Sequence, residues 1–481
     1  MAKSNSISTS MIYKTLERYS VMLFQMVVQI IIARILAPSE YGVIAMMTVF
    51  INIATVFTQN GFNRAVVQKK EAGNVDFGTA LTINFIIGCF FYLLIFITAP
   101  WIAAYYHNTD IKLCIRVLAL ILPLGSLNSI QVAIANRQMA FGGLFVCTLV
   151  ASVLSGVVGV VCAVCGLGVW ALIIQQISNV LITTILLSTT LNWKPRFCYD
   201  KDSAKSMFSF GWKMMAAALL NTVYNELSSL IIGRRYTSSD LAFYSKGKYF
   251  PSMITTGMDA AMDSVMLSSF AKNQENIASL HLLMKKSQNI NCYLLFPSLA
   301  LFAVIAEPVI ELALTEKWLP CLPFLYIACF TFAFQPISSS QMQSIAAIGR
   351  SDIRLKLEFL KKGVGVLLLI PSIKYGPWGI AVAAGITSIC GLIINTVACK
   401  KIVRYPISET VKDVFPILLV SLAVMALMFY IKSLIVSPWL QIIVVGLAGF
   451  SLYILVTGLL KFFGFSYLKD FVFTKIRSIK K

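Results

Sequence analysis

The sequence predicts an all-α integral membrane protein of about 14 transmembrane helices, in two parallel six-helix repeats around a central cavity, with two extra C-terminal helices. Three observations predict this architecture. The composition is too apolar for a soluble domain, apolar runs of about 20 residues follow one another along the chain, and short blocks of sequence recur at a fixed distance.

The composition excludes a soluble globular protein. Of the 481 residues, 58% are hydrophobic and 12% are charged, whereas a soluble domain carries about 25% charged residues. A chain this apolar cannot cover itself with a polar surface. The loops between the apolar runs are short, so we expect no outer loop large enough to hold a catalytic domain.

The apolar runs give the expected spans. They cover residues 18–36, 41–60, 79–104, 113–135, 144–165, 168–191, 208–233, 243–270, 288–314, 319–346, 355–375, 377–399, 412–432 and 438–461. All seven Trp lie near the ends of these spans, which is typical of the aromatic belts at membrane–water interfaces.

The net charge of +20 predicts topology rather than nucleic-acid binding. With an even number of spans, both termini lie on one side, and thirty of the 40 Lys and Arg fall on that side. Because positive charge marks the cytoplasmic side of a membrane, we expect both termini in the cytoplasm. Attraction to anionic headgroups or to an anionic substrate is a secondary consequence.

An internal repeat divides the chain. Ile31-Ile-Ala-Arg34 recurs as Ile231-Ile-Gly-Arg234, and Ser39-Glu40 recurs as Ser239-Asp240, at an offset of 200 residues. A second block matches at an offset of 213 residues, pairing Pro123, Ser126, Ala133 and Arg137 with Pro336, Ser339, Ala346 and Arg350. Copies with an even number of spans enter the membrane in the same direction, and such parallel repeats place the substrate path at their interface.

The repeat sets the expected domains. Residues 1–198 form the N-lobe with helices one to six, and residues 199–405 form the C-lobe with helices seven to twelve. Residues 406–481 add two transmembrane helices and a basic cytoplasmic tail.

Polar residues follow one face of the first two helices of each repeat. The expected lining residues of a polar cavity are Gln25, Gln29, Asn52, Gln59, Asn221, Asn225 and Ser252. Polar groups are costly in hydrocarbon, so four such stripes on equivalent helices favour a cavity between the lobes. The alternative is that these amides and hydroxyls only link packed helices or bond their own backbone.

Charged residues in the same helices are candidates for binding anions and for coupling. Arg18, Lys14 and Lys248 could bind phosphate, although Arg18 could equally pair with an acid or a lipid headgroup. The candidates for ion coupling are Glu226, Asp259 and Asp263, which could instead only balance the basic residues. Of these acids, Glu226 points away from the polar face of its helix.

We expect no catalytic site, metal or cofactor. The chain has two His and no cluster with metal-ligand spacing, and Cys162 and Cys165 lie in an apolar helix, where thiolate chemistry is disfavoured. Motifs for nucleotide binding, serine hydrolysis and zinc peptidases are missing from the sequence. The sequence therefore predicts a transporter rather than an enzyme.

One segment resembles a known family. Ile31-Ile-Ala-Arg-Ile-Leu-Ala-Pro-Ser-Glu-Tyr-Gly-Val-Ile-Ala45 and Gly61-Phe-Asn-Arg-Ala-Val-Val-Gln68 resemble signature segments of bacterial polysaccharide flippases of the Wzx type, and most of all their colanic-acid-exporter-like branch. These proteins belong to the multidrug/oligosaccharidyl-lipid/polysaccharide exporter superfamily. In its peptidoglycan-precursor flippases, arginines of the N-lobe cavity act on the substrate, and Arg18 stands at a comparable place.

The resemblance implies a function and a location. Members move undecaprenyl-diphosphate-linked oligosaccharides across the bacterial cytoplasmic (inner) membrane for lipopolysaccharide, capsule or exopolysaccharide biosynthesis. The implied partners are the lipid bilayer, that substrate and the polysaccharide polymerase machinery, with no nucleic acid.

Two other classes stay open at this point. A multidrug or toxin cation antiporter of the same superfamily would prefer an acidic cavity, against which the cavity's basic residues count. A membrane polysaccharide polymerase or ligase would need a sizeable outer loop with His, Arg or acidic residues.

Overall fold

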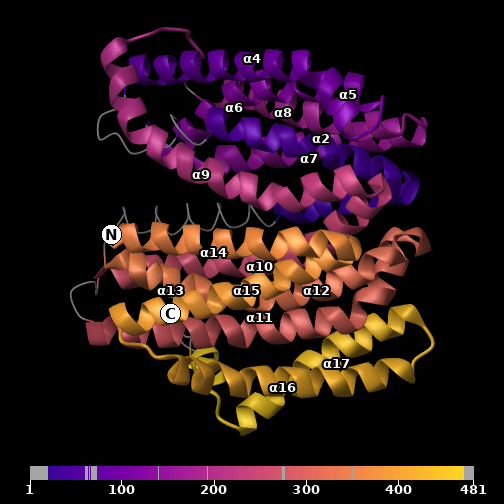
Figure 1. The fold of residues 1–481 in the computed structure, drawn as a ribbon, viewed down its shortest axis with the longest axis vertical. Helices are drawn as coiled ribbons and strands as arrows, with labels where there is room; N and C mark the ends of the chain where they lie inside the picture. The colour runs from indigo at the N-terminus through magenta and orange to yellow at the C-terminus, as the bar shows by residue number, and fades with distance from the viewer. Residues whose placement is uncertain are drawn as a thin grey trace, which may run out of the picture. The chain divides into compact units, whose positions relative to one another are not determined.

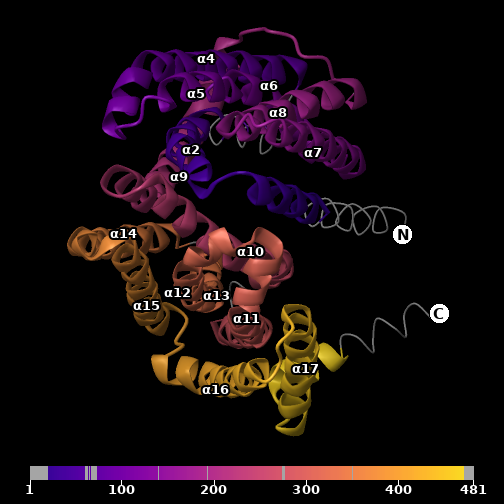
Figure 2. The ribbon, with the colours of Figure 1, turned by 90° about the vertical axis from the view of Figure 1, so that its right-hand side faces the viewer.

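The computed structural model describes residues 20–470 except 60–62, 64–65, 67–72, 139, 192, 273–276 and 349, and omits the side chains of 210, 259–269, 271–272, 277 and 351. Across these residues the chain is helical with short connections and contains no strand. Figures 1 and 2 show the helices. Their bounds are Ser20–Ile35, α2 Pro38–Gln59, α4 Asn74–Tyr105, α5 Ile111–Leu118, α6 Ile121–Arg137, α7 Phe141–Val164, α8 Val169–Thr190, α9 Lys201–Arg235, α10 Ser238–Lys272, α11 Ile277–Leu314, η1 Glu316–Cys321, α12 Leu322–Ala333, α13 Gln335–Ala347, α14 Ser351–Ser372, η2 Ile373–Tyr375, α15 Gly376–Ile402, α16 Ile407–Ser433 and α17 Pro438–Leu459.

Each predicted span corresponds to a helix or to a broken helix. The span at 113–135 is divided into α5 and α6, and the span at 319–346 into η1, α12 and α13. Pro123 and Pro336 stand in the first turns of α6 and α13, where a missing N–H costs no helical hydrogen bond. Within the described residues, eleven segments are long and apolar enough to cross a membrane.

The surface of the helices is apolar in the way that a bilayer requires. On α17, large hydrophobic side chains at intervals of three and four residues are exposed, among them Leu440, Ile443, Leu447 and Phe450. Such a stripe is unfavourable in water, whereas lipid tails cover it without cost. The protein is therefore a multi-pass membrane protein, and the predicted fold class is confirmed.

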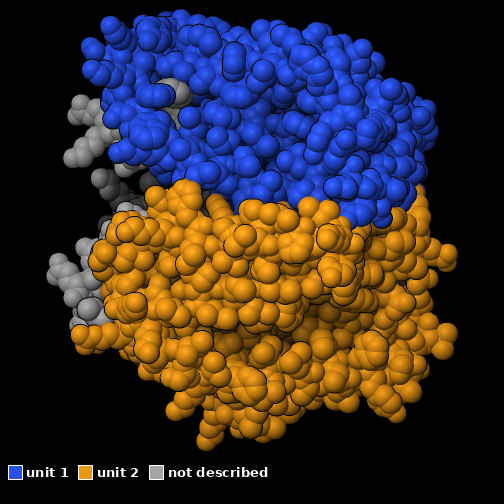
Figure 3. Space-filling model, in the orientation of Figure 1, with its two compact units in different colours: residues 1–242 blue, residues 243–481 orange. Residues whose placement is uncertain are grey.

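Two compact units make up the chain, residues 1–242 and residues 243–481, coloured separately in Figure 3. In the first unit α7 packs against α8, α4 against α6, and α2 against α9. In the second unit α11 packs against α12, α13, α16 and α17. This division falls after α9, whereas the lobes predicted from the repeat divide before it at residue 198. A repeat boundary and a packing boundary need not coincide, and the lobe division stays a prediction.

The repeat at an offset of 200 residues builds the same turn twice. The first helix ends at Ile35 and α9 at Arg235, and the next helices begin at Pro38 and Ser238. In one turn the Glu40 carboxylate accepts a hydrogen bond from the backbone N–H of Ala37 at 2.7 Å, and in the other Asp240 accepts one from Thr237 at 3.1 Å. The matching acidic residues are thus helix N-terminal caps, which satisfy otherwise unpaired backbone donors.

A buried hydrogen bond recurs later in each copy. The Gln131 amide donates to the Ser188 hydroxyl at 2.6 Å, and the Gln341 amide donates to Thr396 at 2.9 Å. Both glutamines are fully buried: Gln131 links α6 to α8, and Gln341 links α13 to α15. An offset of 210 residues relates the two glutamines and also the last residues of α6 and α13, Arg137 and Ala347. The predicted offset of 213 aligns the prolines but not these helix ends.

The two added helices are held to the second unit by polar contacts with α11. The Tyr453 hydroxyl donates to the Tyr293 backbone carbonyl at 3.0 Å. Ion pairs join α11 to α16, namely Glu307–Lys432 at 2.7 Å and Lys285–Asp413 at 3.1 Å, and the His281 ring hydrogen-bonds the Glu409 carboxylate at 2.9 Å. In the connection before α16, Tyr405 donates to Asp413 at 2.7 Å. Burial, and then the Asp413 carboxylate, raise the pKa of the Tyr405 phenol, so it stays a donor at neutral pH.

Gly42 tests the packing of the first unit. A methyl group at this position would overlap the backbone carbonyl of Ser238, where α10 begins. We expect Gly42→Ala to destabilise the protein by about 1–3 kcal/mol, as overpacking does, and to lower its melting temperature in detergent. The control is Gly446→Ala, because no atom lies within 4 Å of a methyl group there. Equal melting temperatures for the two variants would contradict this account.

Candidate functional site

The first predicted stripe divides into a packed residue and an exposed one. Gln29 is half-buried, and its amide donates to Gln175 of α8 at 3.3 Å, while the Tyr41 hydroxyl donates to the Gln29 amide oxygen at 3.3 Å. Gln29 therefore links three helices, as the packing alternative requires. Gln25, one turn earlier, is exposed. Lys14 and Arg18 lie outside the described residues.

The second and seventh predicted helices meet at two of the predicted site residues. The Asn52 amide of α2 donates to the Glu226 carboxylate of α9 at 2.9 Å. The sequence placed Glu226 away from the polar face of α9, and the structure shows that its carboxylate bonds to α2. Hydrogen bonds to an ionised acceptor are stronger than neutral ones, so this pair contributes to holding α9 against α2.

Contacts at the end of α9 reinforce this junction. The Arg234 guanidinium hydrogen-bonds the His107 ring and lies 5.1 Å from the centroid of the Tyr105 ring. His107 has φ of 53°, in the left-handed region that few residues other than glycine adopt. At Gly233 an added methyl group would lie 2.8 Å from the Tyr106 ring, so the absence of a side chain permits the close approach of α9. The junction is the best-connected polar region of the predicted site.

The remaining predicted residues are exposed or bonded locally. Gln59, Asn221, Asn225 and Lys248 expose their side chains. Ser252 donates to the Tyr249 carbonyl of its own helix at 2.7 Å. Asp259 and Asp263 belong to α10, but their side chains lie outside the described part. The meeting of these residues in a cavity stays a prediction.

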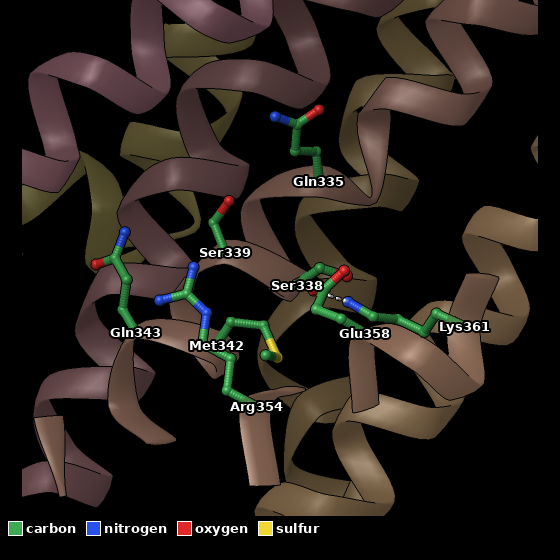
Figure 4. A pocket seen from close by; sticks show the side chains of 8 residues that line it. All are labelled: Gln335, Ser338, Ser339, Met342, Gln343, Arg354, Glu358 and Lys361. Carbon is green, nitrogen blue, oxygen red and sulfur yellow. Dashed lines mark hydrogen bonds and ion pairs between the residues drawn. The ribbon is translucent and has the colours of Figure 1, made fainter. Parts of the chain in front are cut away.

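A polar pocket in the second unit was missed by the sequence analysis. Its volume is about 380 Å³, within the range of small-molecule sites. Figure 4 shows its lining residues, which are Gln335, Ser338, Ser339, Met342 and Gln343 of α13 and Arg354, Glu358 and Lys361 of α14. The sequence did contain a signal for this pocket: the spacing of residues 354, 358 and 361 places them within about 60° on one helical face.

The described residues contain no group of three His, Cys, Asp or Glu side chains arranged to hold a metal ion. The polar groups of the described sites are amides, hydroxyls and charged side chains.

Comparison with protein families identifies the chain. The model of a family described as polysaccharide biosynthesis protein matches residues 31–323, which is more than half of the sequence. The chain belongs to this family. The predicted resemblance to polysaccharide flippases is thereby confirmed.

Curated relatives are similar at low identity. The succinoglycan biosynthesis transport protein ExoT of Rhizobium meliloti is 21% identical over 323 residues, covering 67% of this chain and 65% of the relative. The teichuronic acid biosynthesis protein TuaB of Bacillus subtilis is 22% identical over 324 residues, covering 66% and 65%. The matched part thus spans just under two thirds of these two relatives. The lipopolysaccharide biosynthesis protein WzxC of Escherichia coli is 22% identical, covering 78% and 76%.

Solved structures share the fold. A lipid II flippase MurJ in an inward closed conformation superposes with a TM-score of 0.78 at 14% identity, covering 96% of this chain and 100% of that one. An inward-facing multidrug resistance transporter of the MATE family, from the MOP superfamily, gives a TM-score of 0.60 at 13% identity, covering 80% and 94%. The chain therefore shares the fold of these two structures.

The Asn52–Glu226 pair can be tested by a double-mutant cycle. We expect Asn52→Ala and Glu226→Ala each to lower the free energy of unfolding, with a coupling energy of about 1 kcal/mol between them. Glu226→Gln should retain much of the stability, since a neutral amide oxygen still accepts the hydrogen bond. Chemical or thermal unfolding of the purified variants measures this, and strictly additive single effects would refute a direct interaction.

Proposed function

We propose that the chain moves undecaprenyl-diphosphate-linked oligosaccharide repeat units across the bacterial cytoplasmic membrane, for the biosynthesis of lipopolysaccharide O-antigen, capsule or exopolysaccharide. The observation that carries this proposal is the family match across residues 31–323. The names of the relatives ExoT and WzxC, which refer to succinoglycan biosynthesis transport and to lipopolysaccharide biosynthesis, support it.

The chemistry of the substrate fits the residues available. A diphosphate carries about two negative charges and cannot cross hydrocarbon unaided. Arg18 and Lys14 near the cytoplasmic side, and Lys248 nearer the outside, supply cations along a path. Exposed amides such as Asn221 and Asn225 offer paired donors and acceptors for sugar hydroxyls.

Transport needs movement of the lobes and no covalent chemistry. In alternating access one lobe rocks against the other around a fixed site, while the prenyl tail remains in lipid. Because no bond is made or broken, the proposal requires neither a catalytic residue nor a cofactor. The polymerase that joins the repeat units is the expected downstream partner.

The proposed topology places both termini in the cytoplasm. A cytoplasm-dependent reporter fused after Lys481 should be active, and a periplasm-dependent reporter at the same place should be inactive. The reverse result would overturn the arrangement of fourteen spans.

Ion coupling is proposed for the acids of α10. If Asp259 or Asp263 binds the coupling ion, Asn at that position should abolish the dependence of transport on the ion gradient. Unchanged gradient dependence in both single variants and in the double variant would reduce these acids to charge balance.

Deletion of the gene tests the function. We expect loss of one surface polysaccharide, together with accumulation of its lipid-linked repeat unit, and restoration by the full chain. Loss of polymer length with normal surface display of single repeat units would instead indicate a polymerase. Increased sensitivity to cationic drugs with normal polysaccharide would indicate a cation antiporter.

Arg18 tests the capture of the diphosphate. A guanidinium binds phosphate through two parallel hydrogen bonds, which an ammonium cannot match. We expect Arg18→Ala to stop export in complemented cells while the protein still accumulates in the membrane, and Arg18→Lys to retain partial export. Lys213→Ala, which removes an exposed positive charge of α9, is the control. Normal export by Arg18→Ala would place the diphosphate site elsewhere.

A further inference from the structure

The pocket in the second unit has one wall that suits sugar hydroxyls. Gln335, Ser339 and Gln343 lie one turn apart on α13, and Ser338 stands beside them. Amide and hydroxyl groups both donate and accept hydrogen bonds, as sugar hydroxyls do. Met342, also on this wall, offers an apolar surface to the C–H face of a sugar ring.

The opposite wall carries an excess positive charge. Lys361 is paired with Glu358, with 2.6 Å between the ammonium nitrogen and a carboxylate oxygen, so these two charges offset each other. Within the described part of the chain no carboxylate pairs with the guanidinium of Arg354. Figure 4 shows Arg354 reaching from α14 toward the polar side chains of α13. The pocket is therefore suited to a ligand that carries a negative charge.

The first copy of the repeat lacks these charges. At the offset of 210 residues, the positions of Arg354, Glu358 and Lys361 correspond to Leu144, Thr148 and Ala151 of α7. Leu144 and Ala151 are buried, and the Thr148 hydroxyl donates to its own helix. The same helix thus packs in its copy of the repeat without any charge, so folding of the repeat does not require the charged face of α14.

Arg354, Glu358 and Lys361 lie in the first three turns of α14, around the start of the predicted span at 355–375, where positive charge also marks the cytoplasmic side. Topology alone does not require that these charges share one face with an acid and line a pocket. We propose that this pocket is a saccharide subsite that binds an acidic sugar of the transported oligosaccharide. In this subsite the Arg354 guanidinium holds the sugar carboxylate, and the α13 side chains hold its hydroxyls. The proposal rests on the proposed function and adds a selection for substrates whose repeat unit contains a carboxylate.

Glu358 has a defined part in this selection. Its carboxylate holds Lys361 on the pocket wall. It also repels a sugar carboxylate that enters the pocket anywhere other than beside Arg354. The acidic group of the ligand is thereby directed to the Arg354 end of the pocket. A phosphate group of a lipid or of free phosphate shares the negative charge but lacks the ring hydroxyls that the α13 wall would bind.

Binding is tested on the purified full chain in detergent by saturation-transfer NMR. The probes are D-glucuronate and D-glucose, which differ at the carboxylate, with inorganic phosphate as competitor. We expect glucuronate to bind more tightly than glucose, and Arg354→Ala to weaken glucuronate about tenfold, the effect of losing a charge-assisted hydrogen bond. Lys356→Ala is the matched control, because this exposed residue lies on the opposite side of α14.

Three results of this experiment would overturn the proposal. These are equal binding of the two sugars, no effect of Arg354→Ala, and complete displacement of glucuronate by equimolar phosphate. The last result would identify a general anion site.

Export in cells separates this proposal from the proposed function. In the deletion strain, the unmodified chain should restore a polysaccharide whose repeat unit contains an acidic sugar, and Arg354→Ala should reduce its export about tenfold at equal protein level. Arg354→Lys should retain intermediate export, and Lys356→Ala should export normally. Normal export by Arg354→Ala, or a neutral repeat unit, would overturn the subsite alone. No restoration by the unmodified chain would overturn the proposed function.

Discussion

The fold depends on one constraint: in hydrocarbon, no water is present to bond an exposed backbone N–H or carbonyl group. Every described segment that is long enough to span the membrane therefore forms helix. At helix ends, where backbone groups lack an intrahelical partner, these groups are capped or avoided. Glu40 and Asp240 cap the helices that follow two equivalent turns, and prolines occupy first turns where no donor is needed. The same constraint makes each polar side chain within a span costly, so such side chains mark either links between helices or places where a substrate passes.

The structure separates these two uses of polar residues. The amides of Gln29 and of the buried Gln341 donate to side chains of neighbouring helices, Gln175 and Thr396, and so link packed helices. Asn52 and Glu226 link α2 to α9, and two turns further along α9 Gly233 permits a close approach to Tyr106. In the pocket between α13 and α14, polar and charged side chains line an open volume.

Much of the fold could be predicted because it depends on local patterns. Hydropathy located the spans, and the recurrence of Ser39-Glu40 as Ser239-Asp240 indicated the repeat, which the structure shows as two capped turns. The site was harder to predict, since it depends on which helices face each other. Glu226 lies away from the polar stripe of its helix, and a single helix does not reveal that α2 stands on that side. The positive charges of the chain were interpreted mainly as a topology signal, although the spacing of Arg354 and Lys361 also places them on one face with Glu358.

The departures from repeat symmetry are where a function specific to this chain is expected. Two copies that pack alike need the same buried contacts, and the glutamine links at residues 131 and 341 are shared. The charges of α14 are not shared, and they line a pocket. A transporter built from parallel repeats can in this way keep one framework for movement and use one copy for recognition.

The most direct measurement reconstitutes the purified chain into lipid vesicles that contain its lipid-linked oligosaccharide, and follows sugar oxidation by membrane-impermeant periodate. In vesicles without protein, the oligosaccharide in the inner leaflet should stay protected. With the chain present, the account predicts that this protected fraction becomes accessible over time. An inner-leaflet fraction that stays as protected with the chain as without it would contradict the central claim.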